Sequence, residues 1–218
     1  MAIVDPELMY SMPKGLTAAT GMDALTHAIE SYITPGAWVM SDMFELKAIE
    51  MIAQNLKAAV DNGKDVAARE AMSQAQYIAG MGFSNVGLGI VHSMAHPLGA
   101  FYDTPHGVAN ALLLPYVMEY NAESPAAPKY IHIAKAMGVD TTGMSEAEGV
   151  KAAVEAVKAL SASINIPQKL HEINVKEEDI PALAVAAFND VCTGGNPRPT
   201  SVADIEACLL YTSPSPRD

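Results

Sequence analysis

The chain has 218 residues, half of them apolar but only 6% aromatic, and its formal charge is −12 at pH 7. This length fits one large domain or two small ones and can bury a core without disulfides. Because phosphate binding needs basic patches, the acidic balance argues against nucleic acid as a partner. The two cysteines form no disulfide framework, which favours a reducing cytoplasm. No signal peptide and no membrane span is apparent, so no membrane partner is expected.

Residues 2–4 predict a short strand, which cannot be stable alone. From residue 14 onward the pattern predicts an all-α helical bundle, because no alternating strand pattern follows. Pro97 is expected to end or kink one helix, Pro115 to kink the next, and residues 125–128 to form a loop. The expected helices cover residues 21–33, 41–60, 65–81, 85–102, 106–119, 150–164 and 180–191.

The helix over residues 41–60 has the clearest signature, with Ser41 as a plausible N-cap. Its apolar stripe recurs at a spacing of four through Phe44, Ala48, Ile52, Leu56 and Val60. Residues 209–218, in contrast, show no periodicity and interrupt a helix that starts near Ser201. We expect this tail to be disordered, and a tail foreign to the natural protein is an open alternative.

Four of the six histidines lie in two short segments. Asp23 and His27 form an Asp-x-x-x-His pair, and His92, His96 and His106 fall within fifteen residues. Residues i and i+4 of a helix point the same way, roughly 6 Å apart, so such pairs can share one ion. Imidazole nitrogens with a carboxylate suit Zn²⁺ or Fe²⁺ better than Ca²⁺ or Mg²⁺.

One such pair alone is more often an ordinary surface pair, but two pairs together favour a shared metal site. Which histidines complete the site is left open by the spacing. His132 and His171 are interpreted as ordinary, partly exposed imidazoles. Gly194 and Gly195 are expected to form one of two kinds of turn. The favoured interpretation is a turn that ends a helix, and the alternative is a turn that brings backbone close to a ligand. Cys192 has no neighbouring base, so no nucleophile is proposed.

Three stretches together resemble the iron-dependent (group III) alcohol dehydrogenases. They are Gly-Met-Asp-Ala-Leu-Thr-His-Ala-Ile-Glu from Gly21, Gly-Ile-Val-His-Ser-Met-Ala-His-Pro-Leu-Gly from Gly89, and Thr-Pro-His-Gly-Val-Ala-Asn from Thr104. The likeness spans about residues 1–208. The run over residues 80–89 and the stretch over residues 190–198 resemble family members that act on small diols.

The resemblance implies a metal bound by Asp23, His27, His92 and His106, with Fe²⁺ expected and Zn²⁺ as the alternative. It implies that His96 is a non-ligand near the substrate, in substrate contact or as a proton relay. The implied reaction is hydride transfer between NAD(P) and a small primary alcohol or diol, with lactaldehyde and 1,2-propanediol favoured. A homodimer is implied for the full-length enzyme.

The family's proteins begin with an α/β domain that binds the dinucleotide through a Gly-rich loop, and this sequence shows no such unit. No residue is therefore assigned to dinucleotide binding. We expect residues 1–13 to be a remnant of that domain's last strand and linker. Residues 14–208 are expected to form a helical domain like the C-terminal one of the dehydroquinate synthase-like fold. The chain alone is then expected to bind metal with little NAD-dependent activity.

The sequence leaves two alternatives to a dehydrogenase. One is a metal-binding helical fragment that catalyses nothing, consistent with the lack of a cofactor-binding unit. The other is a lyase-type relative such as dehydroquinate synthase. Because those enzymes use Glu and His ligands, Asp23 in its motif argues against the second alternative.

Overall fold

The computed structural model describes residues 3–213, which form nine α-helices, five short 3-10 helices and no strand. The all-α class expected from the sequence is confirmed. The helices are α1 (Lys14–Ile33), α2 (Val39–Asp61), α3 (Val66–Val86), α4 (Ile90–Tyr102), α5 (His106–Asn121), α6 (Tyr130–Ala136), α7 (Glu146–Ser163), α8 (Ile180–Phe188) and α9 (Val202–Thr212).

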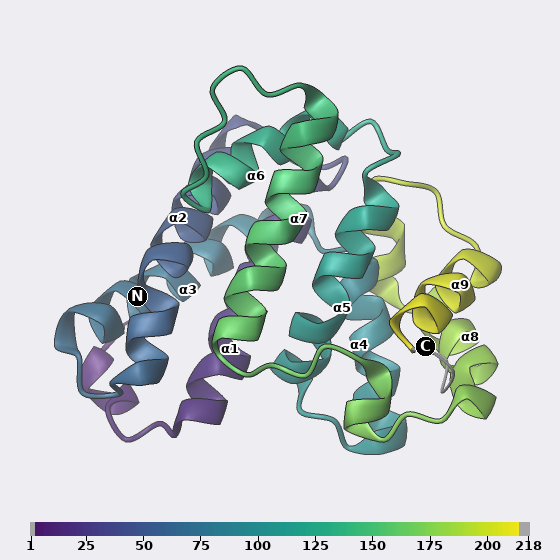
Figure 1. Ribbon diagram of the computed structural model, residues 1–218, viewed down its shortest axis with the longest axis horizontal. Helices are drawn as coiled ribbons and strands as arrows, with labels where there is room; N and C mark the ends of the chain where they lie inside the picture. The colour runs from purple at the N-terminus through teal and green to yellow at the C-terminus, as the bar shows by residue number, and fades with distance from the viewer. Residues whose placement is uncertain (1–2, 214–218) are drawn as a thin grey trace.

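The helices divide into two groups that meet at α1 and α5 (Figure 1). Helix α1 packs against α2, α3 and α5, whereas α4 packs against α5 and α8. Helix α7 crosses in front of this layer in Figure 1 and contacts α5 and α6. Helices α1, α4 and α5 are therefore held from several sides, and these three helices carry the candidate ligands.

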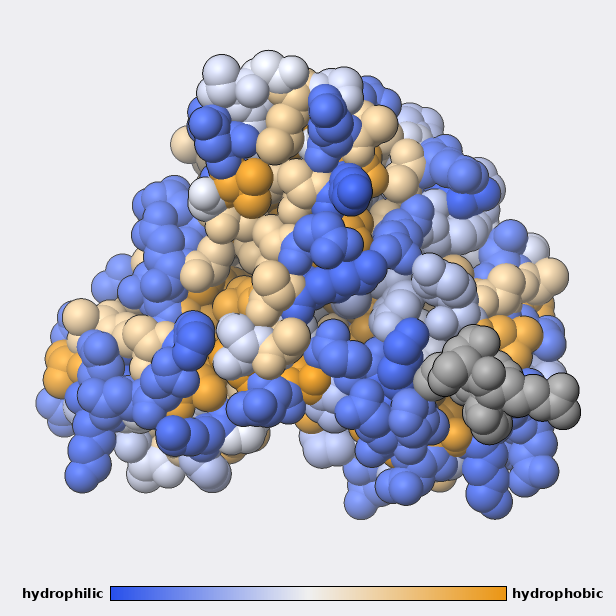
Figure 2. Space-filling model, viewed as in Figure 1, coloured by the Kyte–Doolittle hydropathy of each residue, from blue (hydrophilic) through white to orange (hydrophobic). Residues whose placement is uncertain are grey.

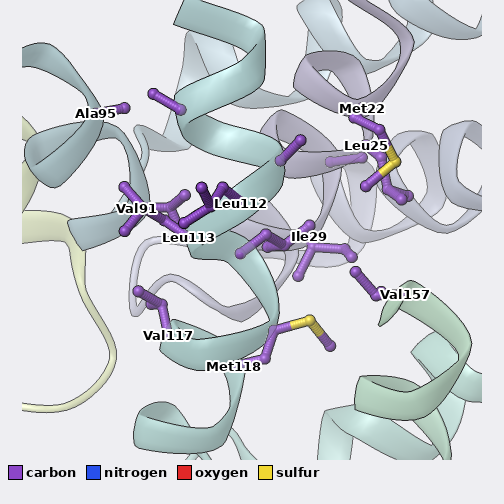
Figure 3. Close-up of a cluster of buried hydrophobic side chains, with 14 of the residues drawn as sticks. Met22, Leu25, Ile29, Val91, Ala95, Leu112, Leu113, Val117, Met118 and Val157 are labelled. Atoms are coloured by element: carbon purple, nitrogen blue, oxygen red, sulfur yellow. The ribbon is translucent and has the colours of Figure 1, made fainter. Parts of the chain in front are cut away.

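A buried apolar cluster lies between these three helices, with α5 at its centre (Figure 3). Burying a side chain such as Leu or Ile contributes roughly 1.5 to 3 kcal/mol. The packing therefore fixes how α1, α4 and α5 sit relative to one another. Figure 3 labels members of the cluster from α1 (Met22, Leu25, Ile29), α4 (Val91, Ala95), α5 (Leu112, Leu113, Val117, Met118) and α7 (Val157).

Hydrophilic residues cover most of the face shown in Figure 2, with hydrophobic residues visible between them in patches. Among the described helices, none is both long enough and apolar enough to cross a membrane.

Helix α1 begins at Lys14, seven residues before the predicted start at residue 21. Its first turn is held by the fully buried guanidinium of Arg69, which comes from α3. Arg69 donates hydrogen bonds to Thr17 Oγ1 at 2.9 Å and to the Met12 carbonyl at 3.1 Å. A partner more than fifty residues away stabilises this turn, which local periodicity cannot reveal.

The helix predicted over residues 85–102 is divided between two elements. Helix α3 continues to Val86, and Gly87, with a φ of +86°, ends it in a conformation that favours glycine. Helix α4 then starts at Ile90 and continues past Pro97 to Tyr102, so Pro97 does not end it. Both Pro97 and Pro115 are buried inside helices, where packing compensates for the lost backbone hydrogen bond.

Other predicted boundaries also shift. Helix α2 starts at Val39, and Ser41 lies inside its first turn, where its hydroxyl accepts a hydrogen bond from the Trp38 N–H. Helix α8 ends at Phe188, three residues early, and the segment predicted as a loop over residues 125–128 partly forms a 3-10 turn (Ala127–Lys129).

The two ends of the chain also differ from expectation. Ile3 and Val4 are exposed and belong to no strand, since no neighbouring strand pairs with them among the described residues; residue 2 lies outside these. Helix α9 continues to Thr212, with Leu209 and Thr212 buried. Residues 209–213 are therefore ordered, which corrects that part of the prediction. The rest of the predicted tail, residues 214–218, lies outside the described residues.

Candidate metal centre

Three helices bring the predicted ligands together. Asp23 and His27 lie one turn apart on α1, and His92 lies in the first turn of α4. Asp103, at a φ of +53°, ends α4, and the chain reverses through Pro105, so that His106 opens α5 beside His92. The centroids of the His92 and His106 rings are 5.4 Å apart.

The distances are those of a compact donor cluster. Potential ligand atoms of Asp23, His27 and His92 all lie within 4.8 Å of one another. Asp23 Oδ1 is 3.8 Å from His92 Nε2 and 3.5 Å from His106 Nε2. Asp23 is thus the common neighbour of all three imidazoles, since its Oδ2 also lies 3.9 Å from His27 Nδ1.

Two of these imidazoles, those of His27 and His106, are shifted toward their neutral form. Burial lowers the pKa of His27 to about 4, and the nearby His92 acts in the same direction. Phe83 of α3 stacks on the His27 ring, with centroids 4.5 Å apart. Burial also lowers the pKa of His106. Neutral imidazoles keep the lone pairs that a cation needs.

His92 carries the observation that bears most directly on a bound ion. Its Nε2 is buried and has no hydrogen-bond partner among the described residues, although its Nδ1 lies 2.5 Å from Glu30 Oε2. An unpaired buried ring nitrogen is costly unless something binds it. With His27, His106 and Asp23, this atom makes a set of three nitrogen donors and one carboxylate, which fits a cation such as Fe²⁺ or Zn²⁺.

Asn110 joins the cluster from one turn beyond His106 on α5. Its Nδ2 donates to Asp23 Oδ1 at 2.6 Å and lies 3.0 Å from His106 Nε2. The Asn110 side chain is fully buried. It therefore ties α5 to α1 directly at the candidate ligands.

His96 lies at the rim of the cluster, with its side chain 44% exposed. Its ring stacks on His106, with centroids 5.5 Å apart, and its Nδ1 lies 2.7 Å from Asp190 Oδ2. Asp190 also accepts a hydrogen bond from the Cys192 N–H, and these contacts hold the pKa of Asp190 below its usual value despite burial. The structure thus places His96 beside the cluster, with a carboxylate to orient it.

The glycine pair after Asp190 lies in a 3-10 helix (Val191–Gly195) rather than in an open turn. A Cβ on Gly195 would come within 2.0 Å of the Leu88 carbonyl oxygen. The close approach is therefore to backbone just before α4. Thr193 of the same segment donates to Ser93 on α4 at 2.8 Å, so this stretch supports the helix that carries His92 and His96.

A cavity of about 480 Å³ lies against Asp23 and His27. Apolar side chains make up much of its wall, including Met9, Met12, Met72 and Phe83. A pocket of this size and character can hold a small organic molecule.

Two histidines lie away from the cluster. His132 pairs with the Tyr32 hydroxyl at 2.8 Å, and His171 is exposed. Burial raises the pKa of the Cys192 thiol to about 12, so it is no activated nucleophile.

Sequence reasoning did not identify Glu30, Asn110 or Asp190 as site residues. Two of them lie at helical spacing from a predicted ligand, which could have identified them. Glu30 lies seven residues after Asp23, on the same face of α1, and Asn110 lies four after His106. Asp190 opens the stretch over residues 190–198 that resembles the family, but it lies ninety-four residues from His96, and only tertiary packing brings the two together.

Comparison with known proteins gives one consistent result. A family model described as "Fe-containing alcohol dehydrogenase family, C-terminal" matches residues 17–212. Lactaldehyde reductase of Escherichia coli (strain K12) is 59% identical over 205 residues, which are 94% of this chain and 53% of that protein. NAD-dependent methanol dehydrogenase of Bacillus methanolicus is 46% identical over 205 residues, 94% of this chain and 54% of that protein.

A solved structure of 1,3-propanediol oxidoreductase superimposes with a TM-score of 0.94 at 46% identity. The match covers 95% of this chain and 54% of that one. The chain thus spans about half the length of the curated relatives it matches.

Proposed function

The chain belongs to the iron-containing alcohol dehydrogenase family, and from that premise we propose that its helical domain holds the catalytic metal of an NAD(P)-dependent oxidoreductase. The proposed reaction is hydride transfer between the dinucleotide and a small primary alcohol or diol, with lactaldehyde and 1,2-propanediol as the favoured pair. The observation that carries the proposal is the buried, unpaired Nε2 of His92 within a cluster of Asp and His side chains.

We assign the metal to Asp23, His27 and His92, whose potential ligand atoms form one group, and to His106, whose Nε2 lies 3.5 Å from Asp23 Oδ1. Fe²⁺ is favoured by the family, and Zn²⁺ is the alternative. The bound cation supplies Lewis acidity toward the substrate oxygen. Asp23 contributes the negative charge, and burial keeps His27 and His106 neutral, so their lone pairs are available.

His96 is proposed to exchange a proton with the substrate hydroxyl. Its Nδ1 faces Asp190, which as a carboxylate can only accept a hydrogen bond, so Nδ1 carries a proton. The other nitrogen, Nε2, is then the atom that gains or loses a proton. The 44% exposure of the His96 side chain leaves it open to substrate and solvent.

The cavity against Asp23 and His27 is proposed to take the short carbon chain of the substrate. Its methionine and phenylalanine walls suit a short carbon chain, and polar residues such as Thr20 and Gln76 also line it. Lactaldehyde and 1,2-propanediol are favoured because the lactaldehyde reductase of Escherichia coli is 59% identical to this chain. NAD(P) binding is assigned to none of the described residues.

A chimera tests the reaction. The part of Escherichia coli lactaldehyde reductase that precedes the matched region is joined to this chain, loaded with Fe²⁺ without oxygen, and assayed for lactaldehyde reduction with NADH and NADPH. We expect substrate-dependent oxidation of the dinucleotide. A folded, metal-loaded chimera without turnover, beside an active Escherichia coli enzyme prepared identically, would contradict the proposed reaction.

A further inference from the structure

Glu30 is an acidic side chain buried almost completely on α1, with only 2% of its surface exposed. Both of its carboxylate oxygens are used by the start of α4. Oε1 accepts a hydrogen bond from the Val91 N–H at 2.7 Å, and Oε2 lies 2.5 Å from His92 Nδ1. A buried carboxylate is stable only when such partners satisfy it. Both partners are at the helix turn that carries a candidate ligand.

The pairing determines which nitrogen of His92 can bind an ion. A carboxylate only accepts hydrogen bonds, so His92 Nδ1 must carry the proton that joins it to Glu30. A neutral imidazole then has its lone pair on Nε2. That atom is buried, unpaired among the described residues, and 3.8 Å from Asp23 Oδ1.

Gly89, the residue before α4, provides the room for Glu30. A Cβ at Gly89 would lie 2.8 Å from Glu30 Oε1, closer than side-chain contacts allow. Its φ of −133° is open to any residue, so space and not backbone conformation favours glycine here. The carboxylate thus lies in a recess formed by the backbone of residues 89–91.

We propose that Glu30 is a positioning residue, which fixes His92 in the Nδ1–H tautomer and so directs Nε2 into the metal site. The inference rests on the proposed function, because it assigns the free nitrogen to a bound cation. Carboxylate partners of this kind orient histidine ligands and increase their basicity. Glu30 itself touches neither metal nor substrate in this account.

The substitution Glu30→Gln tests the proposal with little change in volume. Glu30 faces two hydrogen-bond donors, the Val91 N–H and the His92 Nδ1–H. A glutamine side chain has only one acceptor oxygen, and its second polar group is a donor. One of these hydrogen bonds must fail, or His92 must move its proton to Nε2, which then cannot bind a cation. Glu45→Gln is the matched control, because Glu45 is also fully buried but contacts Gly82 on α3 instead of a candidate ligand.

The first measurement is the tautomer of His92 in the metal-free chain, from ¹⁵N chemical shifts of the histidine rings. We expect the Nδ1–H tautomer in the wild-type chain and its loss in Glu30→Gln. This measurement needs no bound metal. The result for the wild-type chain is informative even if Glu30→Gln does not fold. An Nε2–H tautomer of His92 in the wild-type chain would overturn the proposal.

The second measurement is Co²⁺ affinity by competition with a chelator, with circular dichroism to confirm folding. We expect Glu30→Gln to lose about 10- to 100-fold in affinity and Glu45→Gln to match the wild-type chain. Wild-type affinity in folded Glu30→Gln would reject the role of Glu30. If the wild-type chain binds no Co²⁺, the proposed function fails, and the tautomer measurement alone then decides whether Glu30 orients His92.

Discussion

Gly107 of α5 packs so closely against Ala19 of α1 that a Cβ on Gly107 would lie 2.4 Å from the Ala19 carbonyl oxygen. The backbones of α5 and α1 therefore touch one residue after His106 and four residues before Asp23. This contact sets the separation between the two helices at the point where they contribute candidate ligands.

The substitution Gly107→Ala is expected to force α5 away from α1. Because the obstacle is backbone, overpacking should lower the free energy of unfolding by roughly 1 to 3 kcal/mol. The same shift should weaken Co²⁺ binding, since His106 moves relative to Asp23. Denaturant unfolding and chelator competition measure the two effects.

Gly15→Ala is the control, because a Cβ at Gly15 on α1 meets nothing within 4 Å. Alanine there should leave metal affinity unchanged and stabilise the helix by up to about 1 kcal/mol. Equal effects of the two substitutions would show that the close crossing does not position the ligands.

Glu45 is expected to make stability depend on pH. Its carboxyl group is fully buried on α2, and neither oxygen has a hydrogen-bond partner among the described residues. Burial raises the pKa of Glu45 to about 8, with smaller effects from the nearby Ser31 hydroxyl, which lowers it, and from Asp42, which raises it. The folded chain therefore retains a proton that the unfolded chain releases near its usual pKa of 4.5.

The sign follows from proton linkage. The folded state binds more protons between about pH 4.5 and 8, so the contribution of Glu45 to stability is greatest at low pH and falls as pH rises through this window. The total change is roughly 3 to 5 kcal/mol. Glu45→Gln removes the titration, so its stability relative to wild type should increase from pH 5 to pH 8. Parallel pH profiles of the two proteins would exclude this account.

His96→Ala is expected to separate chemistry from metal binding. Because His96 faces Asp190 at the rim of the cluster, its loss should leave Co²⁺ affinity near the wild-type value. The turnover of the chimera should fall about 100-fold or more, the usual contribution of a positioned acid or base. Metal loss that equals that of a His27 variant would instead make His96 a ligand.

The periodicity of apolar residues predicted most helices and the all-α class, because amphipathic helices record their buried face locally. The fold departs from the prediction where distant partners act, as at the first turn of α1, which Arg69 of α3 holds. The end of α3 was also hard to predict, because Gly87 ends it and several other glycines lie nearby in the sequence.

Asp and His side chains at helical spacing predicted a shared metal site, because such pairs are unusual. The spacing left open which histidines complete that site, and only the resemblance to the iron-dependent alcohol dehydrogenases implied the set of four ligands. Their support was harder to predict. Glu30 and Asn110 resemble ordinary polar residues until burial and hydrogen bonds define their roles. Asp190 reaches His96 only through the packing of α8 against α4.

The most direct test of the central claim, that α1, α4 and α5 build one metal site, is the metal content of four proteins after identical Fe²⁺ or Co²⁺ loading. They are the wild-type chain, His27→Ala, His92→Ala and the control His132→Ala, whose imidazole pairs with Tyr32 away from the cluster. Circular dichroism accompanies each, because His92→Ala leaves the buried Glu30 without one partner. We predict about one ion per wild-type and His132→Ala chain, with most of it lost from folded His27→Ala and His92→Ala. Equal metal content in all four folded proteins would contradict the claim.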